Sequence, residues 1–169
     1  MAIENENKYV LSEAATLEAA LERCGAPQQI EQGYLDSHAR IRRIDGQGSW
    51  FTYKRRLADQ SNVEIETAID TRSFDLLWRE SGRRLRKHRF KLRHGEIGWD
   101  VDFFKSEPGG GNYFAMAECE MPEGMTAPPD IHPLLRRHIL FAVPREDDRF
   151  RSYLLTDEAY AVALKLSLR

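Results

Sequence analysis

Apolar and polar residues alternate with a period of two along most of this chain, a pattern typical of strands. Eight segments carry the pattern between turn-forming residues, and we expect a strand at each of them. They span residues 2–11, 28–35, 39–44, 49–57, 62–70, 83–94, 98–104 and 113–121. Few of the connections are long enough for a helical crossover, so the strands are expected to pair mainly antiparallel.

Helical periodicity is confined to short segments. The first predicted helix begins after Ser12 and ends before Gly25, and a second spans about residues 71–81. Residues 134–140 and 157–166 are expected to form further helices, packed on the outside of the strands. The expected fold class is therefore α+β, mainly β.

The composition narrows the classes of protein that fit. The chain has 169 residues, 41% of them apolar and 31% charged, with a net charge of −2. These values predict one globular domain over residues 1–169 and no bulk attraction to nucleic acid or to a membrane. Two cysteines without a CxxC motif argue against a disulfide scaffold or a zinc site. Since no long apolar run is present, we expect a soluble protein of the cytoplasm.

Charged residues are sorted by sign along six of the predicted strands. Each of these strands carries two like charges at positions i and i+2, which face the same side of a strand. The pairs are Glu4/Glu6, Arg40/Arg42, Lys54/Arg56, Glu64/Glu66, Lys87/Arg89 and Glu118/Glu120. One such pair is what any solvated strand face shows, but six pairs favour a common site. A closed antiparallel barrel with a polar interior is the simplest arrangement that gathers them.

The two signs together indicate a ligand class. Clustered arginine and lysine side chains suit a polyanion, because guanidinium groups form paired hydrogen bonds with phosphate oxygens. Carboxylates in the same cavity would repel that polyanion unless Mg²⁺ or Mn²⁺ lay between them. The glycines at 109–111 lack the spacing of a phosphate-binding loop. The pattern therefore predicts a phosphate chain bound together with a divalent cation.

Several motifs of this chain occur in the order found in a known family. They are Glu4-x-Glu6-x-Lys8, Gln32-Gly33-Tyr34-Leu35, Arg40-Ile41-Arg42, Thr52-Tyr53-Lys54, Glu64-Ile65-Glu66, Lys87-His88-Arg89, Trp99-Asp100-Val101-Asp102 and Ala117-Glu118-Cys119-Glu120. Over residues 2–121 this ordered set resembles the CYTH superfamily of triphosphate tunnel metalloenzymes. The resemblance implies an eight-stranded antiparallel tunnel. The segment 149–154 only partly resembles the family's C-terminal region.

The resemblance also implies roles for individual residues. Divalent metals would be held by Glu4, Glu6, Glu64, Glu66, Glu118 and Glu120. A triphosphate would be bound by Lys8, Arg40, Arg42, Lys54, Lys87 and Arg89. Glu4, Glu6, Lys8 and Tyr34 would form the catalytic group, although Tyr34 is equally well explained as a packing aromatic. Apart from the resemblance, Asp102 either orients a basic neighbour or is an exposed strand residue, and the first reading is favoured.

Three functions remain open, and hydrolysis is favoured because cyclisation needs a nucleoside pocket that no sequence feature indicates. The first is hydrolysis of inorganic triphosphate or an organic triphosphate such as thiamine triphosphate, by attack of a metal-activated water. The second is the class IV type of adenylyl cyclase, and the third is a polyphosphate-binding module without turnover. The expected cofactor is Mg²⁺ or Mn²⁺, and the expected partner is a small triphosphate. An outward apolar sheet face leaves a homodimer open as well.

Overall fold

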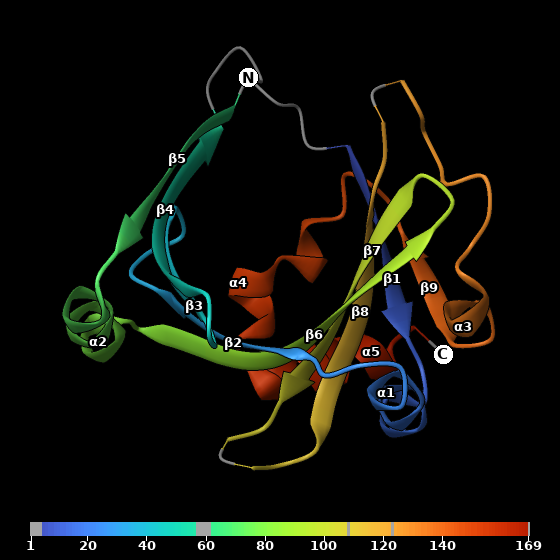
Figure 1. Cartoon of the computed structure of the whole chain (residues 1–169), viewed down its shortest axis with the longest axis horizontal. Coiled ribbons are helices and arrows are strands. Elements are labelled where there is room, and N and C mark those ends of the chain that lie inside the picture. The colour runs from blue at the N-terminus through green and yellow to red at the C-terminus, as the bar shows by residue number, and fades with distance from the viewer. Residues whose placement is uncertain (1–4, 57–61, 108, 123, 169) are drawn as a thin grey trace. The chain divides into compact units, whose positions relative to one another are not determined.

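The computed structural model describes residues 5–56, 62–107, 109–122 and 124–168, and it is mainly β (Figure 1). Its strands are β1 (Glu6–Leu11), β2 (Gln28–Tyr34), β3 (Ala39–Ile44), β4 (Gly48–Arg56), β5 (Asn62–Ile69), β6 (Arg83–His94), β7 (Ile97–Lys105), β8 (Asn112–Glu120) and β9 (Ile139–Val143). Its helices are α1 (Ala14–Glu22), α2 (Thr71–Glu80), α3 (Pro133–Arg136), α4 (Ser152–Leu155) and α5 (Glu158–Leu166), with a 3₁₀ turn at Asp148–Phe150. The α+β, mainly β class is confirmed.

The strands form one nine-stranded sheet in the order β5-β4-β3-β2-β6-β7-β8-β1-β9. All eight predicted strands are present, but the expected closure is wrong, because β5 and β9 are the two ends of this order in the described chain. β1 pairs antiparallel with β8 on one side and with β9 on the other. Since β9 pairs with the second side of β1, that side is not available to β5, and the described residues form no closed eight-stranded barrel.

The ninth strand was not predicted. The expected helix at 134–140 is confirmed only over its first residues: α3 covers Pro133–Arg136, and β9 begins at Ile139. The sequence of β9 is ILFAV, a short run without alternation, so its period gave no strand signal. Its register places Phe141 opposite Val10 and Ala142 opposite Tyr9.

The chain divides into two compact units, which are described separately. Unit 1 comprises the described residues from Gln28 to Arg86 and contains β2 to β5, α2 and the start of β6. Helix α2 is capped by Asp70, whose carboxylate accepts the Ser73 N–H at 2.7 Å. Its buried Phe74 lies under the Arg43 guanidinium, 4.3 Å from the ring centre. At Gly33 an added Cβ would come within 2.5 Å of Ser81 Oγ, so this close approach requires glycine.

Unit 2 comprises the described residues from Asn5 to Pro27 and from Lys87 onward. Its apolar core packs α1 against β6, β7 and β8, with Leu17, Leu21 and Trp99 each 1% exposed. Beside this core the carboxylate of Glu18 accepts hydrogen bonds from Lys105, Asn112 and, at 2.9 Å, His88 Nδ1. Helix α5 packs against β8. Within the described residues no helix is both long enough and apolar enough to cross a membrane.

Candidate functional site

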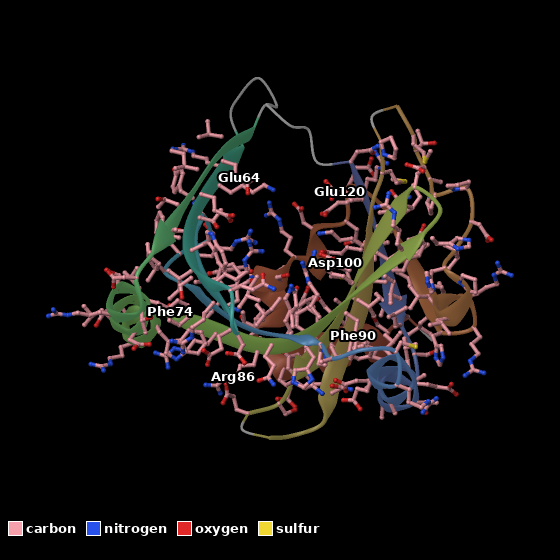
Figure 2. The ribbon with its side chains drawn as sticks, in the orientation of Figure 1. Glu64, Phe74, Arg86, Phe90, Asp100 and Glu120 are labelled. Carbon is pink, nitrogen blue, oxygen red and sulfur yellow. The ribbon has the colours of Figure 1, made fainter. Side chains whose placement is uncertain are left out.

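In unit 2 the charged residues gather on one face of β1, β8 and β7. The antiparallel register places Glu6 opposite Glu120 and Lys8 opposite Glu118, and it places Asp100 opposite Glu118 from the other side. Opposed residues in an antiparallel pair project from the same face. Asp100 and Glu120 can be followed in Figure 2. The intervening residues project to the opposite, apolar face, which carries the core of unit 2.

Lys8 lies among these carboxylates. Its ammonium is 3.0 Å from Glu6 Oε1 and 3.4 Å from Glu118 Oε1. Burial lowers the pKa of Lys8, but the two carboxylates outweigh that effect and raise the pKa above its ordinary value. Like charges directly opposite one another repel, so a cation at this position stabilises the acidic face. The predicted phosphate contact thus serves here as counter-ion to two predicted metal ligands.

The predicted substrate residues of β6, Lys87 and Arg89, are both held by Asp102. Lys87 Nζ lies 2.6 Å from Asp102 Oδ2, and Arg89 donates to both oxygens of Asp102 at 2.7 Å. The expectation that Asp102 orients a basic neighbour is confirmed. Asp100 accepts a further bond from Arg89, and Glu118 lies 3.7 Å from the same guanidinium. The Arg89 guanidinium therefore lies between the buried Asp102 and the carboxylates of the acidic face.

Burial and neighbouring charges both shift the pKa values of Lys87 and Asp102. Lys87 is 4% exposed and Asp102 1% exposed. Burial, together with the nearby Arg89, lowers the pKa of Lys87, although Asp102 opposes this change. Burial also disfavours the charged form of Asp102, but Lys87 and Arg89 outweigh it and hold the pKa of Asp102 below its ordinary value. The carboxylate stays ionised between its two partners.

Unit 1 carries a second charged face. The register places Lys54 opposite Glu64 and Thr52 opposite Glu66, so these side chains share one face of β4 and β5. Lys54 lies 3.6 Å from Glu64, and Glu66 Oε2 accepts from Thr52 Oγ1 at 2.8 Å. Arg42 Nη2 also contacts Glu66, at 3.3 Å. The two predicted acidic residues of unit 1 are thus each paired with a predicted phosphate-binding cation.

Arg40 and Tyr34 lie opposite each other on the same face of unit 1. The Arg40 Nε is buried and has no hydrogen-bond partner among the described residues. A buried donor of this kind is costly unless an acceptor reaches it, and a phosphate oxygen is such an acceptor. Tyr34 is 7% exposed, and its hydroxyl oxygen accepts a hydrogen bond from Gln32 Nε2. The role of Gln32 was not predicted, because a single amide adds nothing to a charge pattern.

Whether the predicted glutamate ligands can hold a metal depends on how closely their carboxylate oxygens lie together. Glu4 lies outside the described residues. Among the described residues, only Glu18, Glu22 and His88 have three potential ligand atoms within 4.8 Å of one another, and the Lys105 ammonium already contacts Glu18 at 2.7 Å. The carboxylates of Glu6, Glu118 and Glu120 do not form so tight a group. Glu6 and Glu118 share the Lys8 ammonium as a partner, and Glu120 lies opposite Glu6; their carboxylate oxygens are donors of the kind that Mg²⁺ or Mn²⁺ prefers.

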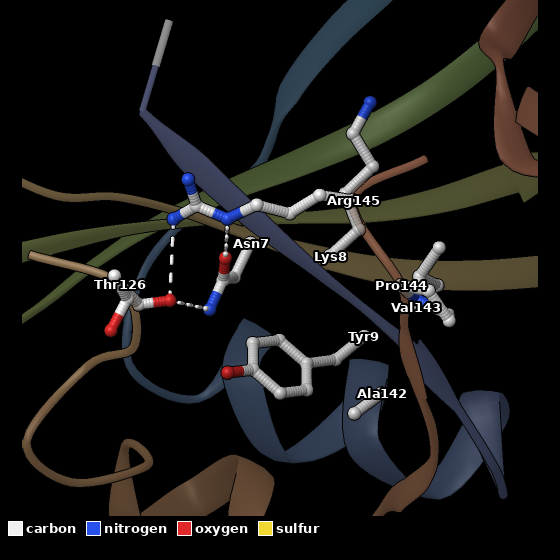
Figure 3. A pocket seen from close by; sticks show the side chains of 8 residues that line it. All are labelled: Asn7, Lys8, Tyr9, Thr126, Ala142, Val143, Pro144 and Arg145. Atoms are coloured by element: carbon white, nitrogen blue, oxygen red, sulfur yellow. Dashed lines mark hydrogen bonds between the residues drawn. The ribbon is translucent and has the colours of Figure 1, made fainter. Parts of the chain in front are cut away.

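Two hollows in unit 2 are lined in part by Lys8. One, of about 220 Å³, is lined by Glu6, Lys8, Val143, Pro144, Arg145, Asp147, Asp148, Phe150 and Arg151. The other, of about 390 Å³, is lined by Asn7, Lys8, Tyr9, Thr126, Ala142, Val143, Pro144 and Arg145 (Figure 3). Arg145 borders both. The sequence pattern did not single out this residue, because it lies alone in an irregular segment after β9.

Comparison with known proteins shows the fold and no more. No family model and no curated protein matches the chain. A proposed adenylate cyclase from Bacillus halodurans has a similar solved structure, with a TM-score of 0.52 and 15% identity over 72% of this chain and 81% of that one. The PH1012 protein from Pyrococcus horikoshii OT3 gives a TM-score of 0.48 and 20% identity over 73% of this chain and 81% of its own.

Proposed function

We propose that the protein is a divalent-cation-dependent hydrolase of triphosphates, either inorganic triphosphate or an organic one such as thiamine triphosphate. The observation that carries the proposal is the acidic face of unit 2, where Lys8 contacts Glu6 and Glu118 within 3.4 Å and Arg89 approaches from β6. Carboxylates and cations on one face suit a phosphate chain bound with a metal. The ordered motifs that resemble the CYTH superfamily support the same reading.

Carboxylates would bind the divalent metal. Glu6, Glu118 and Glu120 would hold it, together with Glu4. Glu64 and Glu66 remain proposed as further acidic ligands, although Lys54 and Arg42 contact them in the structure. When bound, Mg²⁺ or Mn²⁺ supplies charge neutralisation for phosphate oxygens and lowers the pKa of a coordinated water.

The cationic side chains would bind and orient the phosphate groups. Lys8, Lys87 and Arg89 in unit 2 and Arg40, Arg42 and Lys54 in unit 1 take this role. Transfer of a phosphoryl group depends mainly on positioning and charge neutralisation, and it needs no covalent intermediate on the protein. Asp102 holds Lys87 and Arg89 in place, so these donors need little reorganisation when an anion binds. Tyr34, oriented by Gln32, is proposed as a further catalytic group.

A second candidate is cyclisation of ATP to cyclic AMP and pyrophosphate. The similar Bacillus halodurans structure, described as a proposed adenylate cyclase, favours it. The two reactions share the same metal and phosphate contacts. They differ in the phosphorus atom that is attacked and in the need for a nucleoside pocket.

The experiment is a product analysis. Purified protein is incubated with inorganic triphosphate, ATP or thiamine triphosphate, with and without Mg²⁺ or Mn²⁺, and phosphate, pyrophosphate and cyclic AMP are separated. Metal-dependent phosphate release supports hydrolysis, and pyrophosphate with cyclic AMP supports the cyclase. Binding without any product supports a binding module, and absence of binding with metal present excludes all three functions.

Two variants test the site within this assay. Arg42→Ala and Glu118→Ala are each expected to lower kcat/KM by about 100-fold or more, because each removes a charge that acts on the transition state. Glu96→Ala and Arg93→Ala are matched controls, since the Glu96 side chain is 92% exposed in the β6–β7 turn and the Arg93 side chain 73% exposed at the end of β6. Full activity of both site variants would overturn the assignment of these residues.

A further inference from the structure

Arg145 connects three segments of unit 2 that are far apart in the sequence. Its Nε donates to Asn7 Oδ1 at 3.2 Å, and its Nη2 donates to Asn5 Oδ1 at 2.9 Å. The same Nη2 donates to the main-chain oxygen of Thr126 at 3.2 Å. Figure 3 shows the bonds to Asn7 and Thr126. One guanidinium, on the second residue after β9, thus joins this segment to the start of β1 and to the loop after β8.

The two asparagines extend this connection. The Asn5 amide nitrogen donates to the main-chain oxygens of Pro122 at 2.6 Å and Met125 at 2.9 Å. The Asn7 amide nitrogen donates to the Thr126 oxygen at 3.2 Å. Each amide therefore accepts from Arg145 through its oxygen and donates to the loop through its nitrogen. An ionised carboxylate of the same size only accepts, so it cannot reproduce both roles.

These asparagines flank a proposed metal ligand. Asn5 and Asn7 lie on either side of Glu6, and alternation along β1 turns Glu6 and Lys8 to the opposite face. The loop that the amides bind follows directly on β8, which carries Glu118 and Glu120. The Met121 N–H also donates to the main-chain oxygen of Asn5, at 2.9 Å. The bonds of Arg145 thus fix the two strand ends that bear the carboxylates.

We infer that Arg145 is a positioning residue, which holds the end of β1 against the end of β8 so that Glu6, Glu118 and Glu120 keep one spacing for a divalent cation. This inference rests on the proposed function, because it assumes that these carboxylates bind the metal. Residues that orient metal ligands from outside the coordination sphere commonly change affinity by about 10- to 100-fold when they are replaced.

A positioning role and a purely electrostatic role of Arg145 predict opposite changes in cation binding when the residue is removed. Arg145 lines the hollow that Glu6 also lines, so it is a positive charge near the proposed metal site. If charge alone mattered, removing Arg145 would strengthen cation binding, because repulsion between two cations would be lost. Removing a positioning residue has the opposite effect, since the carboxylates lose their fixed spacing.

The experiment is a calorimetric titration of the full chain with Mn²⁺ alone. Arg145→Gln and Asn7→Ala are each expected to weaken Mn²⁺ binding by about tenfold, and the double variant by little more than either single one, because both remove the same connection. Arg151→Gln is the matched control: it removes a positive charge from the same hollow, and its side chain is 66% exposed and paired with Asp148. This control is expected to bind Mn²⁺ as tightly as the parent or more tightly.

The remaining outcomes are distinct. Unchanged or tighter Mn²⁺ binding by Arg145→Gln, with a lower melting temperature, would overturn the inference and leave Arg145 a purely structural contact. If Arg145→Gln fails to fold, Asn7→Ala decides on the same grounds. Glu118→Gln tests the proposed function itself: if this variant binds Mn²⁺ as the parent does, the metal assignment fails whatever Arg145 does.

Discussion

Asp102 shows at the scale of one residue why the β6 cations can be buried. An ionised lysine with 4% exposure is costly unless a carboxylate lies beside it, and Asp102 accepts from both Lys87 and Arg89. We expect Asp102→Ala to lower the free energy of unfolding by about 3–5 kcal/mol, because it leaves two cations without their buried partner. Urea unfolding measures this value. Asp148→Ala, at a position 78% exposed, is the control and should change it by less than about 0.5 kcal/mol. A similar small change for both variants would contradict this account of Asp102.

The sequence indicates residue types at the site better than it indicates their partners. Charges at alternate positions predicted that Lys8, Glu6 and Glu118 would share a face, and the register places them together. The same pattern could not predict that Lys8 contacts two carboxylates, because cross-strand register depends on pairing that no single strand contains. The asparagines of β1 gave no signal either. Their amides donate to main-chain oxygens of a loop more than a hundred residues away in the sequence.

At the scale of elements, Glu18 attaches α1 to the sheet. Burial disfavours its ionised form, but hydrogen bonds from Lys105, Asn112 and His88 outweigh this and hold the pKa of Glu18 below its ordinary value of 4.5. A carboxylate with a depressed pKa stabilises the fold above its unfolded pKa, and that stability is lost as the pH falls through the folded pKa. The docking of α1 should therefore weaken in acid.

Glu18 should account for part of the fall in the free energy of unfolding at low pH. We expect the free energy of unfolding of the parent protein to fall as the pH drops below about 4.5, and Glu18→Gln to show a shallower fall. At pH 7 the variant should be less stable by about 1–3 kcal/mol, because Lys105 loses its charged partner. Chemical unfolding from pH 3 to pH 7 gives both quantities. Parallel pH curves for the two proteins would show that Glu18 does not carry this dependence.

Elements of the sheet differ in how well the sequence predicts them. β6 carries its charges at alternate positions, and the end of β8 alternates over Ala117–Glu120, so periodicity predicted both strands. β9 has five apolar residues without alternation, and only its pairing with β1 makes it a strand. The expected barrel closure failed for the same reason. Whether a sheet closes depends on which strand reaches the last free edge, and no local pattern contains that information.

For the whole molecule, the near-neutral net charge of −2 conceals two charged faces, one in each unit. In unit 2, Lys8 and Arg89 approach carboxylates, and in unit 1, Lys54 and Arg42 do so. These pairs neutralise each other in the structure as it stands. A polyanion and a divalent cation bound together would replace them with stronger partners, so ligand binding should stabilise the fold only when both are present.

The requirement for both anion and cation can be tested by the melting temperature of the full chain. A ligand that binds only the folded state at about 100 times its Kd adds about 2.7 kcal/mol to the free energy of unfolding. For a chain of this size we therefore expect inorganic triphosphate with Mg²⁺ to raise the melting temperature by about 5–10 °C. Triphosphate with EDTA, or Mg²⁺ alone, should give a much smaller shift, because unneutralised carboxylates repel the polyanion and a metal alone makes fewer contacts. Scanning fluorimetry measures all three conditions. An equal shift with EDTA would mean that the cationic residues bind the anion without a metal, which would remove the reason for assigning one to Glu6 and Glu118.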